Sequence, residues 1–219
     1  MLHKKIQILS IDTHSNQCLV ALSNNGISQA AFVSNEPNKH DKLLAEFTRR
    51  IFVDNNISID NLKAISIISG PGSFTGLRIG FALVKGLIME NKVNLIKLPT
   101  SEIYAYQAKE FANQLNKQKI ISIIPGSSGK CFWQEFDNNA NPITGLESVD
   151  ENMITFYDKY LYVGNFEINN YELHKKMQLN FINPFYLTTL SYMKYLESNF
   201  SDPNNFDPDY YFEFIPRTK

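Results

Sequence analysis

A glycine-rich segment, SGPGSFTGLRIG, constrains this 219-residue chain most, because it lies where a strand pattern gives way to a helical one. Strands that run through glycines into a helix build phosphate sites, since backbone N–H groups and the helix N-terminus face the anion. The segment has no Walker A lysine, and Gly70, Gly72 and Gly76 are spaced G-x-G-x-x-x-G rather than G-x-G-x-x-G. It therefore predicts either a phosphate site or a tight turn whose helix is capped by Ser73 or Thr75.

Hydrophobic periodicity around this segment predicts alternating strands and helices. The expected strands are 6–11, 18–23, 27–33, 64–69 and 93–98, and the expected helices are 41–53, 74–90 and a third that Thr100 or Ser101 caps and that ends near 115. Asn24-Asn25-Gly26 is a typical hairpin turn between the second and third strands. The order βββαβαβα indicates an α/β lobe.

The second half of the chain begins with the same strand–turn–strand pattern as the first. Its expected elements are strands 119–124, 131–136 and 160–163, a turn at 125–129 and a helix at 187–200. Three prolines in the segment after 201 predict an extended or looped tail. We therefore expect two lobes, residues 1–100 and 101–219, the second less regular than the first.

Composition restricts the class of protein. Hydrophobic residues make up 43% of the chain and aromatic residues 13%, which is enough for a sizeable core. The net charge of −1 creates no field that attracts nucleic acid or anionic membrane. Cys18 and Cys131 have no CxxC partner, so we expect reduced, buried thiols. No stretch has the length of a signal peptide core or a membrane span, which predicts a cytoplasmic protein without membrane contact.

Three motifs together resemble the TsaB (YeaZ) family: Ile11-Asp12-Thr13, the glycine-rich segment, and Leu98-Pro-Thr-Ser101. The resemblance extends from Ile8 to about Phe136, and beyond it only a proline–tyrosine tail is similar. It implies the two-lobed α/β fold of actin, Hsp70 and sugar kinases (the ASKHA fold), with duplicated βββαβα lobes and a reduced second lobe.

The resemblance also implies a function. Members of the family resemble the catalytic paralogue TsaD and act with TsaD and the ATPase TsaE in threonylcarbamoyl transfer to a tRNA adenosine. This chain would be a non-catalytic scaffold that meets tRNA only indirectly and forms a homodimer when alone. Two first-lobe helices are implied to pair with the partner. The expected interface residues are Leu43, Phe47, Ile51, Gly76, Gly80, Phe81 and Val84.

The helix glycines have two interpretations. Gly76 and Gly80 are four residues apart, as are Ala82 and Gly86, so small residues repeat along the helix. An interior glycine costs about 1 kcal/mol relative to alanine. That cost is typical of positions where another backbone approaches closely. The approaching backbone could belong to this chain's own sheet or to a second protein.

Enzymes of this fold hold phosphate between two turns, one in each lobe, and both turns are degraded here. Asp12, Thr13, Gly70 and Gly72 form a degenerate phosphate turn, in which His14 stands where a glycine is wanted. The second turn has Pro125-Gly126, no aspartate, and a proline that removes an N–H donor.

The metal-binding HxxxH motif of the paralogue is missing, and the four lone histidines are interpreted as surface or capping residues. We therefore expect no catalytic residue, no metal and no cofactor, with weak nucleotide binding at the lobe or partner interface kept as an alternative. The competing functions are a residual ATPase or phosphotransferase of the same fold, and a glycoprotease. The glycoprotease would need an HExxH motif or a serine-triad elbow, and the sequence has neither.

Overall fold

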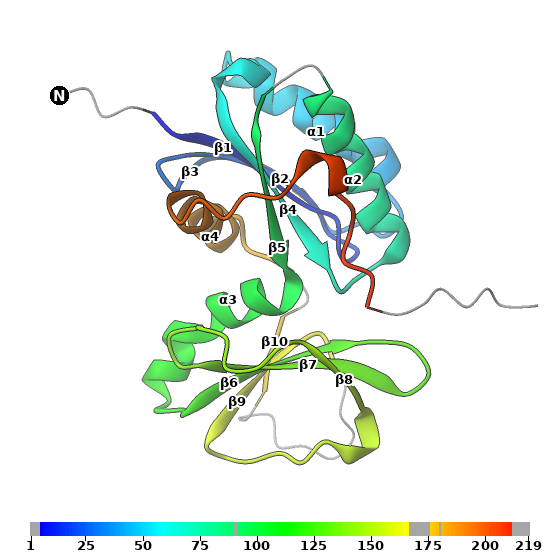
Figure 1. The fold of residues 1–219 in the computed structure, drawn as a ribbon, viewed down its shortest axis with the longest axis vertical. Coiled ribbons are helices and arrows are strands. Elements are labelled where there is room, and N and C mark those ends of the chain that lie inside the picture. Colours follow the sequence, from blue (N-terminus) through cyan, green and yellow to red (C-terminus); the bar gives the residue numbers. More distant parts are fainter. Residues whose placement is uncertain (1–4, 90–91, 167–175, 180, 212–219) are drawn as a thin grey trace, which may run out of the picture.

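The structure is a computed structural model, and it describes residues 5–89, 92–166, 176–179 and 181–211. Two five-stranded sheets form the centres of two lobes, drawn one above the other in Figure 1. The first lobe holds the blue to green strands and the second the green to yellow ones.

The sheet of the first lobe has the strand order β3-β2-β1-β4-β5. Its strands are β1 (Gln7–Asp12), β2 (Cys18–Asn24), β3 (Ile27–Ser34), β4 (Leu62–Gly70) and β5 (Asn94–Pro99). The first three strands are antiparallel neighbours, whereas β4 runs parallel to β1 and to β5. The hairpin turn before β3 is confirmed, since Asn25 and Gly26 have φ of 51° and 78°, as a tight hairpin requires.

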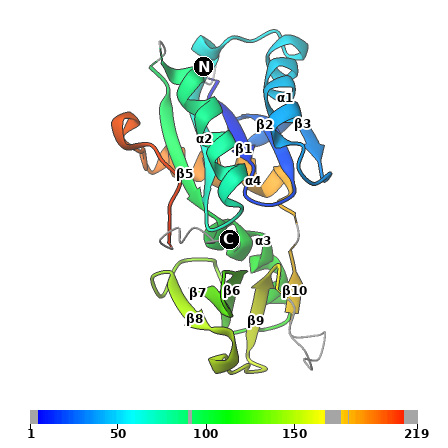
Figure 2. The same cartoon turned by 90° about the vertical axis from the view of Figure 1, so that its right-hand side faces the viewer.

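Two helices cover one face of this sheet, as Figure 2 shows: α1 (His40–Asp54) and α2 (Phe74–Ile88). Both match the predicted helices within two residues at each end. A 3₁₀ turn, η1 (Ile59–Asn61), precedes β4. The hydroxyl of Ser73 accepts a hydrogen bond from the Gly76 N–H at 3.2 Å, so Ser73 rather than Thr75 is the cap of α2.

The second sheet repeats the order of the first. It runs β10-β9-β6-β7-β8, so that β6 to β10 take the places of β1 to β5. Its strands are β6 (Lys119–Pro125), β7 (Lys130–Asp137), β8 (Glu147–Asp150), β9 (Tyr160–Gly164) and β10 (Lys176–Gln178). A single 3₁₀ turn, η2 (Glu151–Met153), stands where the first lobe has α1. The prediction of duplicated lobes with a reduced second copy is confirmed.

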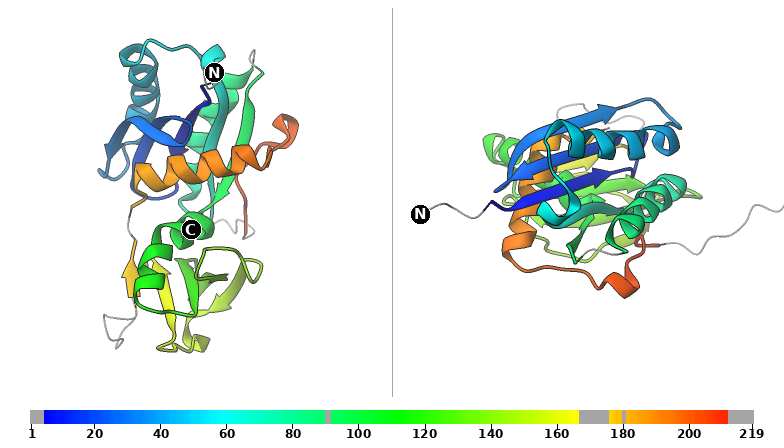
Figure 3. Two further views of the ribbon diagram at one scale, coloured as in Figure 1. Left: turned by 90° about the vertical axis from the view of Figure 1, so that its left-hand side faces the viewer. Right: turned by 90° about the horizontal axis from the view of Figure 1, so that it is seen from above.

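The helix that follows each sheet packs on the other sheet. Helix α3 (Thr100–Gln114) follows the first sheet and lies on β6 and β9, whereas α4 (Pro184–Leu196) follows the second and lies on β1, β2 and β3 (Figure 3). One hydrophobic core therefore extends through both lobes, and it includes Ile8, Ile120 and Leu187, each fully buried. The predicted lobe boundary at residue 100 stays a prediction, and the packing of α4 crosses it.

Two sequence-based predictions about helix ends are wrong. Helix α4 begins at Pro184 rather than 187, because the Asn183 side chain caps it and proline suits the first helical position. It ends at Leu196 rather than 200, and Ser198 has a left-handed φ of 56°. Thr100 does not cap α3, and neither does Ser101. Pro99 occupies the cap position, while the two hydroxyls donate to the Pro71 carbonyl and to Gln134.

The tail is irregular as far as it is described, apart from the 3₁₀ turn η4 (Pro203–Asn205), which confirms the predicted loop over 201–211. It lies against α2 and the first sheet. The ring of Phe206 is buried 4.8 Å from that of Phe81, and the Asp209 N–H donates to the Ser69 carbonyl at 2.9 Å.

Candidate functional site

The first turn, residues 12–17 between β1 and β2, is where an enzyme of this fold would hold phosphate. Here its side chains bind one another. The Asp12 carboxylate accepts from the His14 backbone N–H at 2.9 Å and from His14 Nδ1–H at 2.6 Å. Asp12 is fully buried and His14 is 3% exposed, so no solvent screens this pair.

Helix α3 supplies the next member of this chain. The Tyr104 hydroxyl is hydrogen-bonded to His14 Nε2 at 3.0 Å, and the two rings meet edge to face. Burial, and secondarily the negative charge of Asp12, raise the pKa of Tyr104 far above its ordinary value. The phenol therefore stays protonated at neutral pH, and its hydroxyl can donate to Nε2 or accept from it.

The glycine-rich segment packs against the first turn. The Ser73 N–H donates to the His14 carbonyl at 2.6 Å. A Cβ atom on Gly72 would overlap the His14 carbonyl, and one on Gly76 would overlap the Thr13 carbonyl. Two carbonyl oxygens of the chain thus lie at the N-terminal end of α2, where an anion would otherwise take advantage of the helix dipole.

The remaining glycine of the predicted phosphate turn, Gly70, lies against the C-terminal tail. Gly70 has a φ of 112°, which favours glycine, and a Cβ there would lie 3.3 Å from the Asp209 carbonyl oxygen. Gly70 is therefore needed for its backbone conformation and for the close approach of the C-terminal tail. The space beside it is taken by the tail and is not open to a phosphate.

The first turn also holds α1 and the segment before α4. The Gln17 carbonyl is 2.9 Å from His40 Nε2, at the start of α1. Its side-chain oxygen accepts from the Ile182 N–H at 2.8 Å, two residues before α4.

The second turn, residues 125–129 between β6 and β7, differs in its surroundings. Its residues are exposed, and its hydrogen bonds are mostly internal: the Gly126 N–H donates to the Lys130 carbonyl, and the Lys130 N–H to the Ser127 carbonyl. Ser128 and Gly129 adopt left-handed φ values of 59° and 73°. No carboxylate lies within this turn.

The two turns do not form the pair of phosphate cradles that enzymes of this fold use. In the first lobe the His14 side chain, together with the Thr13 and His14 carbonyls, lies where phosphate donors are expected. In the second lobe Pro125 has no N–H and that of Gly126 is already bonded.

Most of the predicted interface residues are enclosed by this chain's own first lobe. Gly76, Gly80, Phe81, Val84 and Ile51 are buried. A Cβ on Gly80 would lie 2.5 Å from Thr13 Oγ1 and 3.0 Å from Ile67 Cδ1, so this glycine accommodates the chain's own turn and sheet.

Two of the predicted interface residues, Leu43 and Phe47, are partly exposed, and both pack against the core under α1. The small residues that α2 does present to solvent are Ala82 and Gly86. A Cβ on Gly86 would have no atom within 4 Å. An interface on this face would therefore use Ala82 and Gly86 rather than Gly76 and Gly80.

The histidine interpretation is wrong for the two histidines that the structure describes. His14 and His40 are only 3% and 7% exposed. The ring of His14 is hydrogen-bonded to Asp12 and Tyr104, and that of His40 to the Gln17 carbonyl. His3 and His174 lie outside the described residues. Among the residues that are described, no group of three or more His, Cys, Asp or Glu side chains could hold a metal ion.

The cysteine prediction is confirmed: Cys18 and Cys131 are unpaired, and both are 1% exposed. Burial raises the pKa of the Cys18 thiol to about 12 and that of the Cys131 thiol to about 11. Both are therefore protonated and unreactive at neutral pH.

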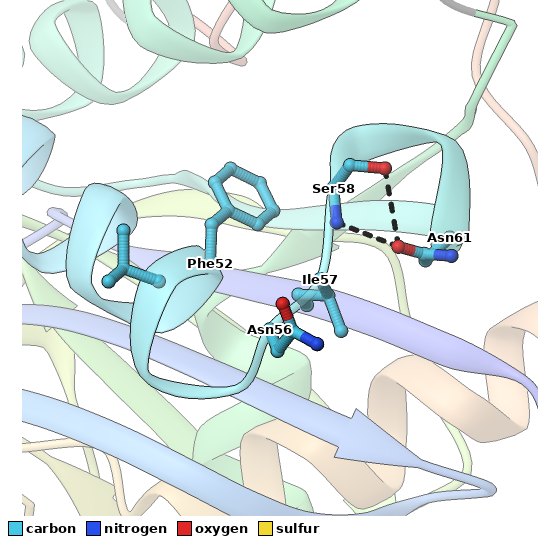
Figure 4. A pocket seen from close by; sticks show the side chains of 6 residues that line it. Phe52, Asn56, Ile57, Ser58 and Asn61 are labelled. Carbon is cyan, nitrogen blue, oxygen red and sulfur yellow. Dashed lines mark hydrogen bonds between the residues drawn. The ribbon is translucent and has the colours of Figure 1, made fainter.

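An open depression of about 530 Å³ lies at the end of α1, away from both turns (Figure 4). Its lining residues are Phe52, Val53, Asn56, Ile57, Ser58 and Asn61. Ser58 and Asn61 bind each other in a capping box, so the polar groups there serve the local fold. None of the lining side chains is titratable, and the depression offers no acid–base chemistry.

Sequence reasoning missed the partners of the first turn. Tyr104 is 90 residues from His14, and Ile182 is 165 residues from Gln17. The local signal that was available is His14 itself, a ring at a turn position where a small residue is wanted. A buried ring with two nitrogens requires partners elsewhere in the fold.

Comparison with known proteins agrees with this geometry. A family model described as TsaD, tRNA N6-adenosine threonylcarbamoyltransferase, matches residues 32–196. The tRNA threonylcarbamoyladenosine biosynthesis protein TsaB of Escherichia coli is 29% identical over 138 residues, which cover 63% of this chain and 58% of that protein. The protein of the same name from Buchnera aphidicola of Schizaphis graminum is 23% identical, over 72% of this chain and 78% of that one.

Among solved structures, YeaZ from Pseudomonas aeruginosa superimposes with a TM-score of 0.79 at 16% identity, covering 94% of this chain and 99% of that one. At that identity the likeness shows the fold.

The duplicated lobes and the crossed helices give this protein the two-lobed fold predicted from the sequence, that of actin, Hsp70 and sugar kinases, and a side chain of its own fills the first turn. The family model covers well over half of the chain, and the chain therefore belongs to the TsaD family of threonylcarbamoyltransferase-like proteins. The predicted resemblance to its TsaB (YeaZ) members is confirmed. No described helix has the length and apolar character needed to cross a membrane.

Proposed function

We propose that this chain is a non-catalytic scaffold in tRNA threonylcarbamoyladenosine biosynthesis, in the cytoplasm. It binds a TsaD paralogue and supports the threonylcarbamoyl transfer that depends on the ATPase TsaE. The observation that carries the proposal is the filled first turn, where Asp12 binds His14 instead of a metal or a phosphate. Family membership supports the assignment to this pathway. The absence of a phosphate cradle in the first turn supports the non-catalytic role.

The surface proposed for the partner is the solvent face of α1 and α2. Leu43 and Phe47 provide partly exposed apolar area on α1, and Ala82 and Gly86 on α2 let another backbone approach. A second copy of the chain would use the same face when the partner is absent, which gives a two-fold homodimer.

The test is partner binding by two matched glycine variants. Gly86→Arg places a long side chain on the proposed surface, and Gly145→Arg places one on the second lobe, where a Cβ also has no atom within 4 Å. Both variants should fold, since surface substitutions usually change stability by less than about 0.5 kcal/mol. We expect Gly86→Arg to weaken binding to the TsaD paralogue and homodimerisation about tenfold. Equal binding by both variants would refute this surface.

The proposal also assigns tRNA contact to the partner. The 21 basic and 22 acidic residues of the chain balance, so few counterions would be released on binding RNA. A gel shift with the isolated chain should show binding no tighter than micromolar, with a shallow dependence on salt. Tight binding with a steep salt slope would move the tRNA contact to this chain.

A further inference from the structure

The first turn contacts both routes by which the chain crosses between lobes. The chain crosses once from β5 into α3 and once from β10 into α4. Tyr104 lies on α3, and Ile182 lies just before α4, and the first turn binds both. A single buried turn of the first lobe is thus joined to each crossing.

The bond to α3 is a bond to the second lobe. Helix α3 packs mainly on β6 and β9 of the second sheet, with smaller contacts to β4, β5 and α4. Tyr104 is 2% exposed, and its hydroxyl reaches His14 of the first lobe. At the start of the same helix, the Thr100 hydroxyl donates to the Pro71 carbonyl in the glycine-rich segment at 2.7 Å.

The bond to the second crossing is reinforced from α3. Gln17 accepts from the Ile182 N–H, and Gln107 on α3 accepts from the neighbouring Asn183 N–H at 2.7 Å. Two glutamines, one from each lobe, therefore hold adjacent backbone N–H groups. These contacts fix the segment before α4 relative to both sheets.

We propose that the first turn, through His14–Tyr104 and Gln17–Ile182, is a latch that sets the angle between the lobes without a ligand. Rotation of packed lobes about a few crossing residues is a low-energy motion in two-lobed folds. Opening the lobes here would break buried hydrogen bonds to a turn that the glycine-rich segment also holds. The latch does not depend on the proposed scaffold function, because its readout is the geometry of the free chain.

The test measures the distance between lobes in the full chain. Spin labels on Ala45→Cys, in α1, and Ser148→Cys, in β8, report that distance, and both positions are exposed. The native thiols are buried and do not compete for the label. The latch variants are Tyr104→Phe and Gln17→Met, alone and combined. The matched control, Tyr106→Phe, removes a hydroxyl from the same helix, where the ring contacts Lys109 and Tyr186 instead of the first turn.

We expect one narrow distance distribution for the wild type and the control, a broader one for each single latch variant, and the broadest for the double variant. Hydrogen exchange of the His14 amide should rise about tenfold in Tyr104→Phe, the effect of losing one buried hydrogen bond. Unchanged distributions in the folded single variants would overturn the proposal, even if their melting temperatures fell. If the double variant does not fold, the two single variants decide.

Discussion

The two turns that occupy equivalent places in the two lobes have opposite surroundings. Apart from Ser15 and Asn16 the first turn is buried, and it is bonded to α1, α3, the cap of α2 and the segment before α4, whereas the second turn is exposed and bonds mainly to itself. Neither turn has the features of a phosphate site, and the two differ in what they have instead. The first is filled by a side chain and is joined to the rest of the fold, and the second is a surface loop. A turn without a ligand site can therefore be among the most firmly held parts of a fold.

The largest difference should come from lengthening each turn by two residues. Inserting Gly-Gly after Thr13, between two buried residues, should prevent folding, because the first turn would no longer meet its partners on four elements. The same insertion after Ser127 should change the free energy of unfolding by less than about 1 kcal/mol, since exposed loops tolerate length. Circular dichroism and denaturant unfolding measure both. Similar losses at the two sites would remove the distinction between the turns.

The next effect concerns the helix that packs on the first turn. Gly80→Leu should lower the free energy of unfolding by about 3 kcal/mol or more, because the side chain would enter the space of Thr13 and Ile67. Gly86→Leu, on the same helix and in open space, is the control and should cost nothing or stabilise slightly. Thermal unfolding of the pair checks this. A Gly80→Leu protein of normal stability with impaired partner binding would restore Gly80 to the interface.

A smaller effect follows from the buried carboxylate. Asp12→Ala leaves the His14 backbone N–H and Nδ1–H without their acceptor and should cost about 2 to 3 kcal/mol. Asp150→Ala, at the exposed edge near the second turn, removes an acceptor for the Asn152 N–H and should cost about 1 kcal/mol or less. Urea midpoints of the two variants give the comparison, and equal shifts would contradict it.

The chain's architecture could be predicted from its sequence where apolar periodicity is strong. Strands β1, β2, β4, β5, β6 and β9 carry runs of buried apolar residues, whereas β3 has no buried residue and was predicted from the hairpin turn before it. The strand β8 was missed because it is four residues long and mostly exposed, and β10 because it has only three residues. Helix α4 begins three residues earlier than predicted, at Pro184, because proline fits the first helical position and Asn183 caps it.

Part of the site could be approached from the sequence. His14, which stands where a small residue is wanted, singled out the first turn, and the structure shows that this side chain binds Asp12 within it. That His14 is buried could not be seen, because its partner Tyr104 reaches it only through the crossing of α3. For the same reason the glycines of α2 left two interpretations open. The spacing of these glycines indicates that another backbone approaches the helix closely. Only the fold shows that this backbone belongs to the first turn of the same chain.

The smallest expected effect is a null result in the second turn. Pro125→Asp restores a carboxylate near the position where enzymes of this fold carry one. The purified variant should hydrolyse ATP no faster than the wild type, which itself should show only background hydrolysis, because the first turn stays filled by His14. A phosphate-release assay measures both proteins. Turnover that appears in the variant and disappears with Asp12→Asn would show that the first turn is less closed than its hydrogen bonds indicate.

The exchange of helices between the lobes has a consequence for synthesis on the ribosome. Both sheet faces of a lobe need cover, yet the first sheet receives α4 only after 85 further residues of the chain have been made. At bacterial elongation rates that interval is roughly 4 to 17 s. During this time Ser10 and Ser66, which later bind Ser191 of α4 in a buried triangle of hydroxyls, face water on an apolar sheet. Until α4 has been made, the face of the first sheet that it covers in the folded protein therefore lacks this helix.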